Sequence, residues 1–412
     1  GLLVAVQDAL CSYEGLSGDV ATFGAGCSVE DALRRLLDDG RQLRGFGGIA
    51  QQRLGGAVST SLHGQHTTSF ATHMVGLRAV LANGTILDSS DPALLDAWRG
   101  SMGRLGILVQ VRLRTWPIEF VECHTRHDAN ASAFSAALRR GGLAGFEAKR
   151  LLSSDAYVVR TCEEAAGNHS RVAYEDKDSV AEGFLLDNVA LPMVTLFGST
   201  LSRARWFARL MLHVSGVATS RRGAVASVND YRVAVSYNPH FDEEYAIPAG
   251  RCHAVLEEIG RAFAGLHVHA FVRRVDADAA WLSWAPVDSC AVRLEYFDYN
   301  RIDFVRYERR FRLRVEEIVL AHNGSGHRGK IWYRSGRGLL AGAPRGAEFE
   351  AYRASLDPTG KFENAFTREM RGDGERTHEV LPHALEVRAF AYRLAVWAAV
   401  GVNAAAALLL CA

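Results

Sequence analysis

Residues 55–64 read Gly55-Gly56-Ala57-Val58-Ser59-Thr60-Ser61-Leu62-His63-Gly64, a run of small side chains that ends in a histidine and a glycine. Small side chains offer little to a hydrophobic core, and glycine lets a backbone approach a ligand closely. Backbone N–H groups, and hydroxyls such as those of Ser59 and Thr60, suit phosphate oxygens. The run indicates backbone lying against a phosphate-bearing cofactor; the alternative is a glycine-rich connection that binds nothing.

The segments on both sides of this run alternate between strand and helix. Ser28 precedes an amphipathic segment that Gly40 ends, which predicts a capped helix. Asn83-Gly84 is the strongest short signal for a β-hairpin. Further strands are expected at residues 2–6, 21–23, 76–81, 85–87 and 107–113, and a further helix at 94–99.

From about residue 119 to residue 320 the pattern changes to longer strands and helices. Apolar periodicity predicts strands at 233–237, 270–275 and 290–296, and helices at 250–263 and 307–320. Strands and helices of this length indicate an α+β fold built on an antiparallel sheet.

Composition limits the classes of protein to which this chain can belong. Its 412 residues exceed what one hydrophobic core usually serves, so two domains are expected. Lys and Arg number 47 against 46 Asp and Glu, which leaves no field to attract nucleic acid and favours a small-molecule partner. The 7 cysteines are scattered without a C-x-x-C pair, and we expect most of them to be buried thiols.

Several motifs of other enzyme classes are absent or incomplete. Residues 324–330 match the G-x-x-x-x-G-K of a phosphate-binding P-loop, but Ile331 stands where Ser or Thr binds magnesium, and a helical pattern precedes the match. Closely spaced histidines such as His63 and His66 lack the spacing and the extra ligands of a zinc site, so no metal is predicted. There is no G-x-S-x-G of α/β-hydrolases and no G-x-G-x-x-G of nicotinamide enzymes.

The two ends of the chain carry their own expectations. Gly1 leads directly into the strand-like residues 2–6, so we expect part of the first domain to lie upstream. Residues 394–412 contain only Asn403 as a strongly polar side chain, and this length is about what spans a bilayer. The tail is interpreted either as a membrane anchor or as an Ala-rich helix or tail without that role.

Landmarks in a fixed order carry a resemblance to a known family. Residues 56–64 resemble the "G-x-x-x-T-x-x-H-G" segment of the aldonolactone oxidoreductases, which are flavoproteins of the vanillyl-alcohol-oxidase type and include L-gulonolactone oxidase, D-arabinonolactone oxidase and L-galactonolactone dehydrogenase. The later landmarks resemble, in family order, a second flavin loop at 101–107, "EYxxP" at 244–248, "LSP" at 282–284 with Trp284 for proline, "HWGK" at 327–330 with Arg328 for tryptophan, and "LDPxGxFxN" at 356–364.

The resemblance implies a two-domain α+β fold of the FAD-binding PCMH/VAO type, with an antiparallel-sheet substrate or cap domain. It places the later part of the FAD-binding domain at residues 1–118, the substrate domain at 119–330, a segment that returns to the flavin site at 331–372, and the apolar tail at 373–412. The family's first phosphate loop, "GxGHS", whose histidine often links covalently to flavin, is expected before residue 1.

The resemblance also implies site residues. The FAD-binding positions are Gly48, Gly55, Gly56, Ser59, Thr60, His63, Gly64, Gly103, Gly106 and Ile107. The candidate catalytic residues are His327, Lys361, Arg273 and Lys330. Arg273 belongs to a strand that reads "E-x-R" in the family, and Phe271 replaces its acid.

The implied function is FAD-dependent oxidation of a sugar 1,4-lactone towards ascorbate or an analogue, with hydride transfer to the flavin. The lactone is a gulono-, galactono- or arabinono-lactone, and oxygen or a cytochrome accepts the electrons. Two alternatives remain: an alditol or sugar oxidase on the same scaffold, and a membrane-anchored paralogue that binds a sugar without oxidising it. Membrane association, mitochondrial or at the endoplasmic reticulum, is expected only if the tail is an anchor.

Overall fold

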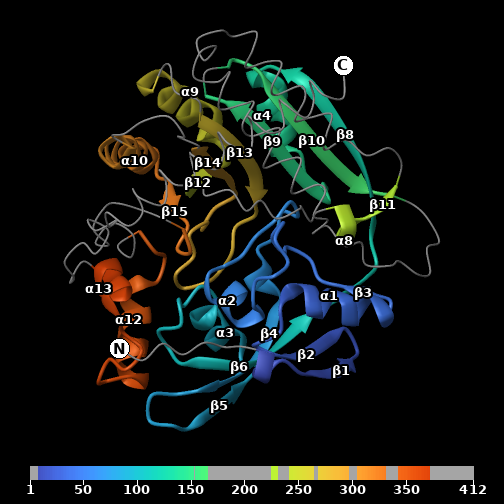
Figure 1. Ribbon diagram of the computed structural model, residues 1–412, viewed down its shortest axis with the longest axis vertical. Coiled ribbons are helices and arrows are strands. Elements are labelled where there is room, and N and C mark those ends of the chain that lie inside the picture. Colours follow the sequence, from blue (N-terminus) through green and yellow to red (C-terminus); the bar gives the residue numbers. More distant parts are fainter. Residues whose placement is uncertain are drawn as a thin grey trace, which may run out of the picture.

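The structure is a computed structural model that describes residues 8–152, 154–165, 224–230, 241–263, 268–296, 304–330 and 342–371. Two antiparallel sheets dominate it, one of five strands and one of eight (Figure 1). The α+β class and the antiparallel sheets expected from the sequence are therefore confirmed. The expected strands at 2–6 and 233–237 and the apolar tail lie outside the described residues.

The smaller sheet belongs to an N-terminal unit, residues 8–117. Its strands run in the spatial order β1 (Tyr13–Ser17), β2 (Val20–Gly24), β6 (Ile107–Arg114), β4 (Met74–Val80) and β5 (Ile86–Ser89). The short helices around it are η1 (Asp8–Leu10), α2 (Leu54–Ser59), η2 (Phe70–His73) and α3 (Pro92–Trp98). The two-residue strands β3 (Arg41–Gln42) and β7 (Trp116–Pro117) pair separately.

Local signals account for the elements of this unit. The longest helix, α1 (Val29–Asp38), begins with a capping box in which Ser28 and Asp31 satisfy each other's backbone N–H groups, and it is followed by Gly40 at a φ of +68°. The hairpin of β4 and β5 turns at Asn83-Gly84, where Asn83 Oδ1 accepts a hydrogen bond from the Thr85 N–H at 3.0 Å. Both predictions are confirmed.

The larger sheet forms the large-sheet unit, residues 120–330. Its strands lie in the order β11 (Val225–Ala226), β8 (Phe120–Ala129), β10 (Tyr157–Glu164), β9 (Gly145–Leu151), β13 (Val268–Val275), β14 (Ser289–Tyr296), β12 (Phe241–Pro248) and β15 (Ser325–Gly326). Its helices are α4 (Ala131–Arg139), α8 (Ser227–Asp230), η4 (Ala249–Arg251), α9 (Cys252–Ala262) and α10 (Phe304–Ala321). The expected strands at 270–275 and 290–296 and the expected helices at 250–263 and 307–320 are confirmed.

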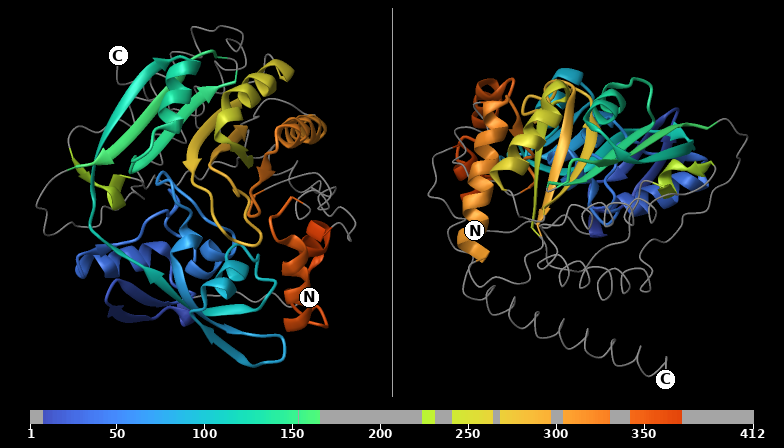
Figure 2. Two further views of the ribbon diagram at one scale, coloured as in Figure 1. Left: turned by 180° about the vertical axis from the view of Figure 1, so that it is seen from behind. Right: turned by 90° about the horizontal axis from the view of Figure 1, so that it is seen from above.

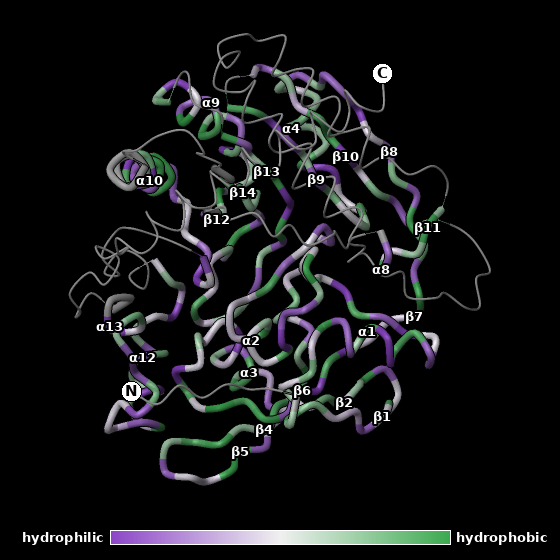
Figure 3. The backbone as a smooth tube through the Cα atoms, viewed as in Figure 1, coloured by the Kyte–Doolittle hydropathy of each residue, from purple (hydrophilic) through white to green (hydrophobic). Residues whose placement is uncertain are grey.

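The two faces of the larger sheet differ in what covers them. Helices α4, α9 and α10 bury one face in a core that includes Phe134, Leu256 and Val315. Along the strands, hydrophobic and hydrophilic residues alternate (Figure 3), as a sheet with one face in the core requires. The opposite face is turned towards the loops of the N-terminal unit, because Glu244 on β12 and Glu147 on β9 contact His63 and Gln65 of that unit.

The last described segment returns to the N-terminal unit. Helices α12 (Gly346–Leu356) and α13 (Ala365–Arg371) lie beside it and not beside the large sheet (Figures 1 and 2). Phe349 of α12 is fully buried in the core of the N-terminal unit, and Arg104, also fully buried, donates a hydrogen bond to Glu350 at 2.9 Å. This contact ties α12 to the loop at residues 101–107.

The prediction that most cysteines are free thiols is wrong. Three disulfides join residues that are distant in sequence: Cys11–Cys27, Cys123–Cys162 and Cys252–Cys290. Cys27, Cys162, Cys252 and Cys290 are buried, as expected. The scattered spacing gives no pairing signal because partners meet only in the folded chain: between two loops at Cys11–Cys27, across the strands β8 and β10 at Cys123–Cys162, and between α9 and β14 at Cys252–Cys290.

Within the part of the chain that the structure describes, no helix is long and apolar enough to cross a membrane.

Candidate active site

Residues 55–64 and 101–107, the two expected flavin loops, lie together. The N–H of Gly100 donates to the carbonyl of Val58 at 3.0 Å, and the N–H of Met102 donates to the carbonyl of Ser59 at 2.9 Å. The first half of the small-residue run forms the short helix α2. Gly55 lets this helix pack closely against Ala25. The two loops therefore form one continuous backbone surface.

Glycines in these loops serve two different needs. A Cβ on Gly64 would lie 1.8 Å from the carbonyl oxygen of Phe46, and one on Gly106 would lie 2.8 Å from that of Val80, so both positions exclude a side chain for reasons of packing. A Cβ on Gly56 or on Gly103 would meet nothing within 4 Å. Open space beside a glycine is what a cofactor lying on the backbone requires.

The remaining expected cofactor residues border the same surface. Gly48 lies half-buried in the loop before α2, Ser59 and Thr60 end that helix, and Ile107 begins β6. Ser101 is 1% exposed, and its Oγ has no hydrogen-bond partner. A buried hydroxyl without a partner beside open glycines fits a phosphate or a flavin edge, so the residues present fit FAD.

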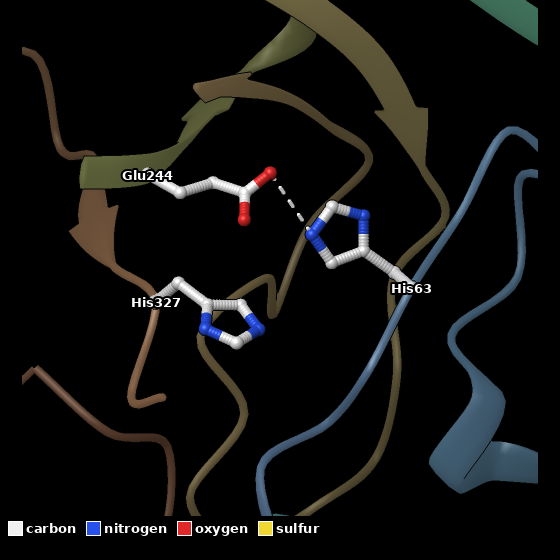
Figure 4. A group of neighbouring side chains, drawn as sticks. All are labelled: His63, Glu244 and His327. Carbon is white, nitrogen blue, oxygen red and sulfur yellow. Dashed lines mark ion pairs between the residues drawn. The ribbon is translucent and has the colours of Figure 1, made fainter. Parts of the chain in front are cut away.

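His63 forms the centre of the site where the two units meet (Figure 4). Its Nε2 lies 3.1 Å from Oε1 of Glu244 on β12, and both side chains are at most 5% exposed. Burial alone would raise the pKa of Glu244, but the contact with His63 and the positive charge of Lys330 outweigh burial and hold that pKa well below its ordinary value. Glu244 is therefore ionised and accepts the Nε2–H of His63.

The other ring nitrogen of His63 is available for chemistry. Its Nδ1 is buried and has no hydrogen-bond partner. Because Nε2 is directed at the carboxylate of Glu244, Nδ1 is the nitrogen of His63 that is left to accept a proton from a ligand. A carboxylate that orients an imidazole in this way is the arrangement by which enzymes prepare a general base.

His327 is positioned by backbone groups. Its Nδ1 accepts a hydrogen bond from the N–H of Gly329 at 3.1 Å, so Nε2 carries the proton and faces the carbonyl oxygen of Ser61 at 3.4 Å. Burial lowers the pKa of His327 to about 3, so the ring is neutral at physiological pH. Both nitrogens are occupied, which favours a positioning role over that of a base.

Trp284 packs against both histidines of the site. Its fully buried ring lies 5.0 Å from the ring of His63 and 4.6 Å, edge-on, from that of His327. The neighbouring Arg328 is also buried, which lowers its pKa to about 10, and it donates to the carbonyl of Gly326 at 3.2 Å. These side chains keep water away from the two histidines.

His63, Glu244 and His327 also offer three potential metal-ligand atoms within 4.8 Å of one another. The 3.1 Å between His63 Nε2 and Glu244 Oε1 is a hydrogen-bond distance, whereas ligand atoms around a tetrahedral zinc ion lie about 3.4 Å apart for bond lengths near 2.1 Å. Both nitrogens of His327 already take part in backbone hydrogen bonds. The arrangement favours handling of protons over binding of a metal ion.

The other expected catalytic residues are divided between the site and the surface. Lys330 lies close enough to Glu244 and His327 to affect the pKa of both. Arg273 lies on β13, with its Nη2 3.7 Å from Glu147 Oε2. Lys361 is exposed, and its Nζ donates to the carbonyl of Ala82 beside the β4–β5 hairpin at 2.7 Å, so the structure gives it an anchoring contact.

Two residues at the centre of the site were not among the predicted ones. Glu244 and Trp284 stood inside family landmarks, but nothing in their local sequence indicates that their side chains meet His63. The signal that finds Glu244 is its strand position, because alternation along β12 places it on the face opposite the buried Tyr245.

Two family models match the chain: an FAD binding domain at residues 1–90 and D-arabinono-1,4-lactone oxidase at residues 153–370. Together with the joined loops and the histidine site, they define the class of the protein, an FAD-dependent oxidoreductase that acts on CH–OH groups. The second match spans more than half of the chain. The chain therefore belongs to the D-arabinono-1,4-lactone oxidase family.

Individual relatives agree with this assignment. The L-gulono-1,4-lactone dehydrogenase of Mycobacterium tuberculosis is 29% identical over 364 residues, which cover 82% of this chain and 81% of the relative. The D-arabinono-1,4-lactone oxidase of Yarrowia lipolytica is 33% identical over 108 residues, 25% of this chain and 20% of the relative. A cholesterol oxidase from B. sterolicum has a TM-score of 0.67 at 15% identity, covering 89% of this chain and 84% of that chain, and shows the shared fold.

Proposed function

We propose that this protein oxidises a CH–OH group of a sugar-derived 1,4-lactone, with the Nδ1 of His63 accepting the proton of the substrate hydroxyl. The observation that carries the proposal is the buried His63–Glu244 pair at the junction of the two units, with its one unpartnered nitrogen. The family and its named relatives support the lactone as the substrate class.

Each residue of the site has a defined task in this reaction. Bound FAD supplies the acceptor for the hydride that leaves the substrate carbon. Glu244 holds the Nε2–H of His63, so Nδ1 faces the hydroxyl and gains its proton as the carbonyl forms. The negative carboxylate then stabilises the imidazolium, which in a buried site is worth several kcal/mol.

The remaining side chains position these groups. Neutral His327 fixes the loop at residues 327–330 against Ser61, and Gly329 fits closely beside Thr60. Lys330 adds positive charge near Glu244, where it stabilises the ionised carboxylate. Trp284 excludes water from both imidazoles. Exclusion of water strengthens the electrostatic interaction of His63 with Glu244.

The proposal is tested by reduction of the bound flavin. The chain is expressed with any upstream sequence, reconstituted with FAD, and mixed anaerobically with gulono-, galactono- and arabinono-1,4-lactones and with open alditols. We expect the visible flavin bands to bleach with at least one lactone. Bleaching by alditols alone would overturn the lactone assignment, and bound flavin that no CH–OH compound reduces would overturn the function. Reoxidation by oxygen or by cytochrome c then identifies the electron acceptor.

A further inference from the structure

The loop at residues 101–107 contains a turn that one of its own residues disfavours. The N–H of Arg104 donates to the carbonyl of Ser101 at 3.1 Å, and Met102 and Gly103 between them have φ values of +58° and +70°. Positive φ at both central residues is the pattern of a type I′ turn. Glycine adopts this conformation freely, whereas the Cβ of methionine is crowded in it. Contacts outside the turn therefore hold Met102 in the left-handed conformation.

The turn carries groups that we assign to FAD. Ser101 is 1% exposed and its Oγ has no hydrogen-bond partner, and a Cβ on Gly103 would meet nothing within 4 Å. One side of the turn is anchored to the first flavin loop, because the N–H of Met102 donates to the carbonyl of Ser59 at 2.9 Å. The position of the Ser101 hydroxyl relative to the backbone at Gly103 depends on the conformation of the turn.

Arg104 anchors the other side of the turn through buried ion pairs. Its side chain is fully buried, with Nη1 2.6 Å from Oε1 of Glu350, and its Nη2 donates to Oε2 of Glu350 at 2.9 Å. Oε1 of Glu363 lies 3.8 Å from the same Nη2. Arg353 joins the two carboxylates, because its Nε lies 3.1 Å from Glu350 Oε2 and its Nη1 3.3 Å from Glu363 Oε1. We call these four residues the arginine network.

The partners of Arg104 belong to the segment that returns to the N-terminal unit, residues 346–364. Phe349 fixes helix α12 in the core of that unit, and its ring centre lies 5.3 Å from the Arg104 guanidinium. Asp357 is buried, and its carboxylate accepts two backbone N–H groups of the loop that leads to Glu363, each at 2.8 Å. Both carboxylates of the arginine network are therefore held in place by contacts that do not involve the turn.

Buried ion pairs of this kind contribute more to position than to stability. Removal of the charges from water offsets much of the attraction between them, and apolar side chains of the same volume give comparable stability. The best-attested use of buried polar groups is to select one arrangement of the segments that carry them. Here Arg104 and Glu350 join the turn to a helix 246 residues away in the sequence.

We propose that Arg104 is a positioning residue for FAD, and that the arginine network holds the turn at residues 101–104 in the left-handed conformation that binds the cofactor. In this conformation the Ser101 hydroxyl and the backbone at Gly103 face FAD. Without the network the turn relaxes, and only a fraction of the FAD-free molecules keeps the binding conformation. The apparent affinity for FAD falls in proportion to that fraction. The network acts on the cofactor, so its role is independent of which compound is oxidised.

FAD binding by the FAD-free full chain tests this role. Titration of flavin fluorescence measures the dissociation constant of FAD in Glu350→Gln and in Arg104→Met. We expect it to rise at least about 10-fold in both, which corresponds to a binding conformation present in at most about a tenth of the FAD-free molecules. The matched control is Glu348→Gln, which removes a carboxylate of the same helix that pairs with Arg345 at the surface. The control is expected to keep the affinity of the unchanged chain.

A second substitution separates positioning from general stability. Met102→Asn places the Asn-Gly pair that type I′ turns prefer at the centre of the turn. In Glu350→Gln it is expected to recover at least about 3-fold in FAD affinity, because the turn then needs less support. With the network intact it is expected to change the affinity little. Amide hydrogen exchange in FAD-free Glu350→Gln is expected to be faster at residues 101–106 and unchanged in the rest of the N-terminal unit.

Three outcomes would overturn the proposal. The first is unchanged FAD affinity in the network variants; if Arg104→Met does not fold, Glu350→Gln decides, because its side chain is 29% exposed and tolerates replacement. The second is an equal effect of Met102→Asn with and without the network, because the network then does not hold the turn. The third is faster hydrogen exchange across the whole N-terminal unit, because the network then supports the fold alone.

Discussion

Gly56 and Gly64 are glycines for different reasons. At Gly56 the backbone faces open space, whereas at Gly64 it lies against the backbone of Phe46. The sequence presents both as members of one glycine-rich run, and the structure separates their roles. Gly64 holds the loop of His63 against Phe46, which positions the histidine. Gly56 leaves room on the surface that we assign to FAD.

Gly56→Ala is therefore expected to stabilise the FAD-free protein and to weaken FAD binding. Without FAD it stabilises the chain by about 0.5–1 kcal/mol, because alanine is the better helix former in α2. With FAD the added methyl group occupies cofactor space and lowers FAD affinity by at least about 10-fold, the order of one steric contact. Urea unfolding and flavin fluorescence titration measure the two effects.

The control for this change is Gly250→Ala. Gly250 also has nothing within 4 Å of an added Cβ, but it lies before α9 in the large-sheet unit. Its FAD affinity is expected to equal that of the unchanged chain. An unchanged affinity in Gly56→Ala as well would show that FAD does not approach this part of α2.

At the scale of elements, the site depends on how strands and loops from distant parts of the sequence are held together. Helix α9 packs on the large sheet and is joined to β14 through Cys252–Cys290, both fully buried. Strand β14 carries Arg293 and pairs with β12, which carries Glu244. The disulfide therefore fixes the strand next to β12, which carries Glu244.

Replacing both cysteines, Cys252→Ala with Cys290→Ala, is expected to lower the free energy of unfolding by about 3–4 kcal/mol, because the bond closes a loop with a sequence separation of 38 residues. Denaturant unfolding measures the loss. Peptide mapping without reductant is expected to recover the two cysteines in one linked pair. Labelling of either by a thiol reagent in the unfolded, unreduced chain would contradict the pairing.

For the whole molecule, burial of neutral histidines contributes to the dependence of stability on pH. Burial lowers the pKa of His66 to about 4, and that of His73 and His327 to about 3. Below about pH 6.5 the unfolded chain gains protons at these positions while the folded chain does not. Unfolding therefore becomes easier as the pH falls from about 6.5 towards these lowered values.

His73→Gln is expected to reduce this dependence. Each buried neutral histidine contributes a slope of about 1 kcal/mol per pH unit between pH 5 and 6, and the variant loses one such contribution. Urea unfolding at a series of pH values measures the slope. The matched variant is His124→Gln, which removes an exposed histidine from β8. Equal slopes in the two variants would contradict the account of His73.

The sequence predicts the structural features that depend on neighbouring residues, but not the contacts between residues that are distant along the chain. The capping box at Ser28 and the hairpin at Asn83-Gly84 are local, and both were predicted. Strands β13 and β14 were also predicted, because their patterns are local. The pairing of His63 with Glu244 and of Cys252 with Cys290 depends on strand register and on the contact between the two units, which no local pattern encodes.

The role of His63 as a base prepared by Glu244 is tested most directly by the rate of anaerobic flavin reduction in Glu244→Gln. Glu243→Gln is the matched control, because Glu243 accepts a hydrogen bond from Tyr245 on the helix-covered face of the same strand. We predict that Glu244→Gln retains FAD but that its flavin is reduced by substrate at least about 100-fold more slowly, which is the contribution of a general base. In Glu243→Gln we predict a rate of flavin reduction close to that of the unchanged protein. Equal rates in both variants, with FAD bound, would contradict the account.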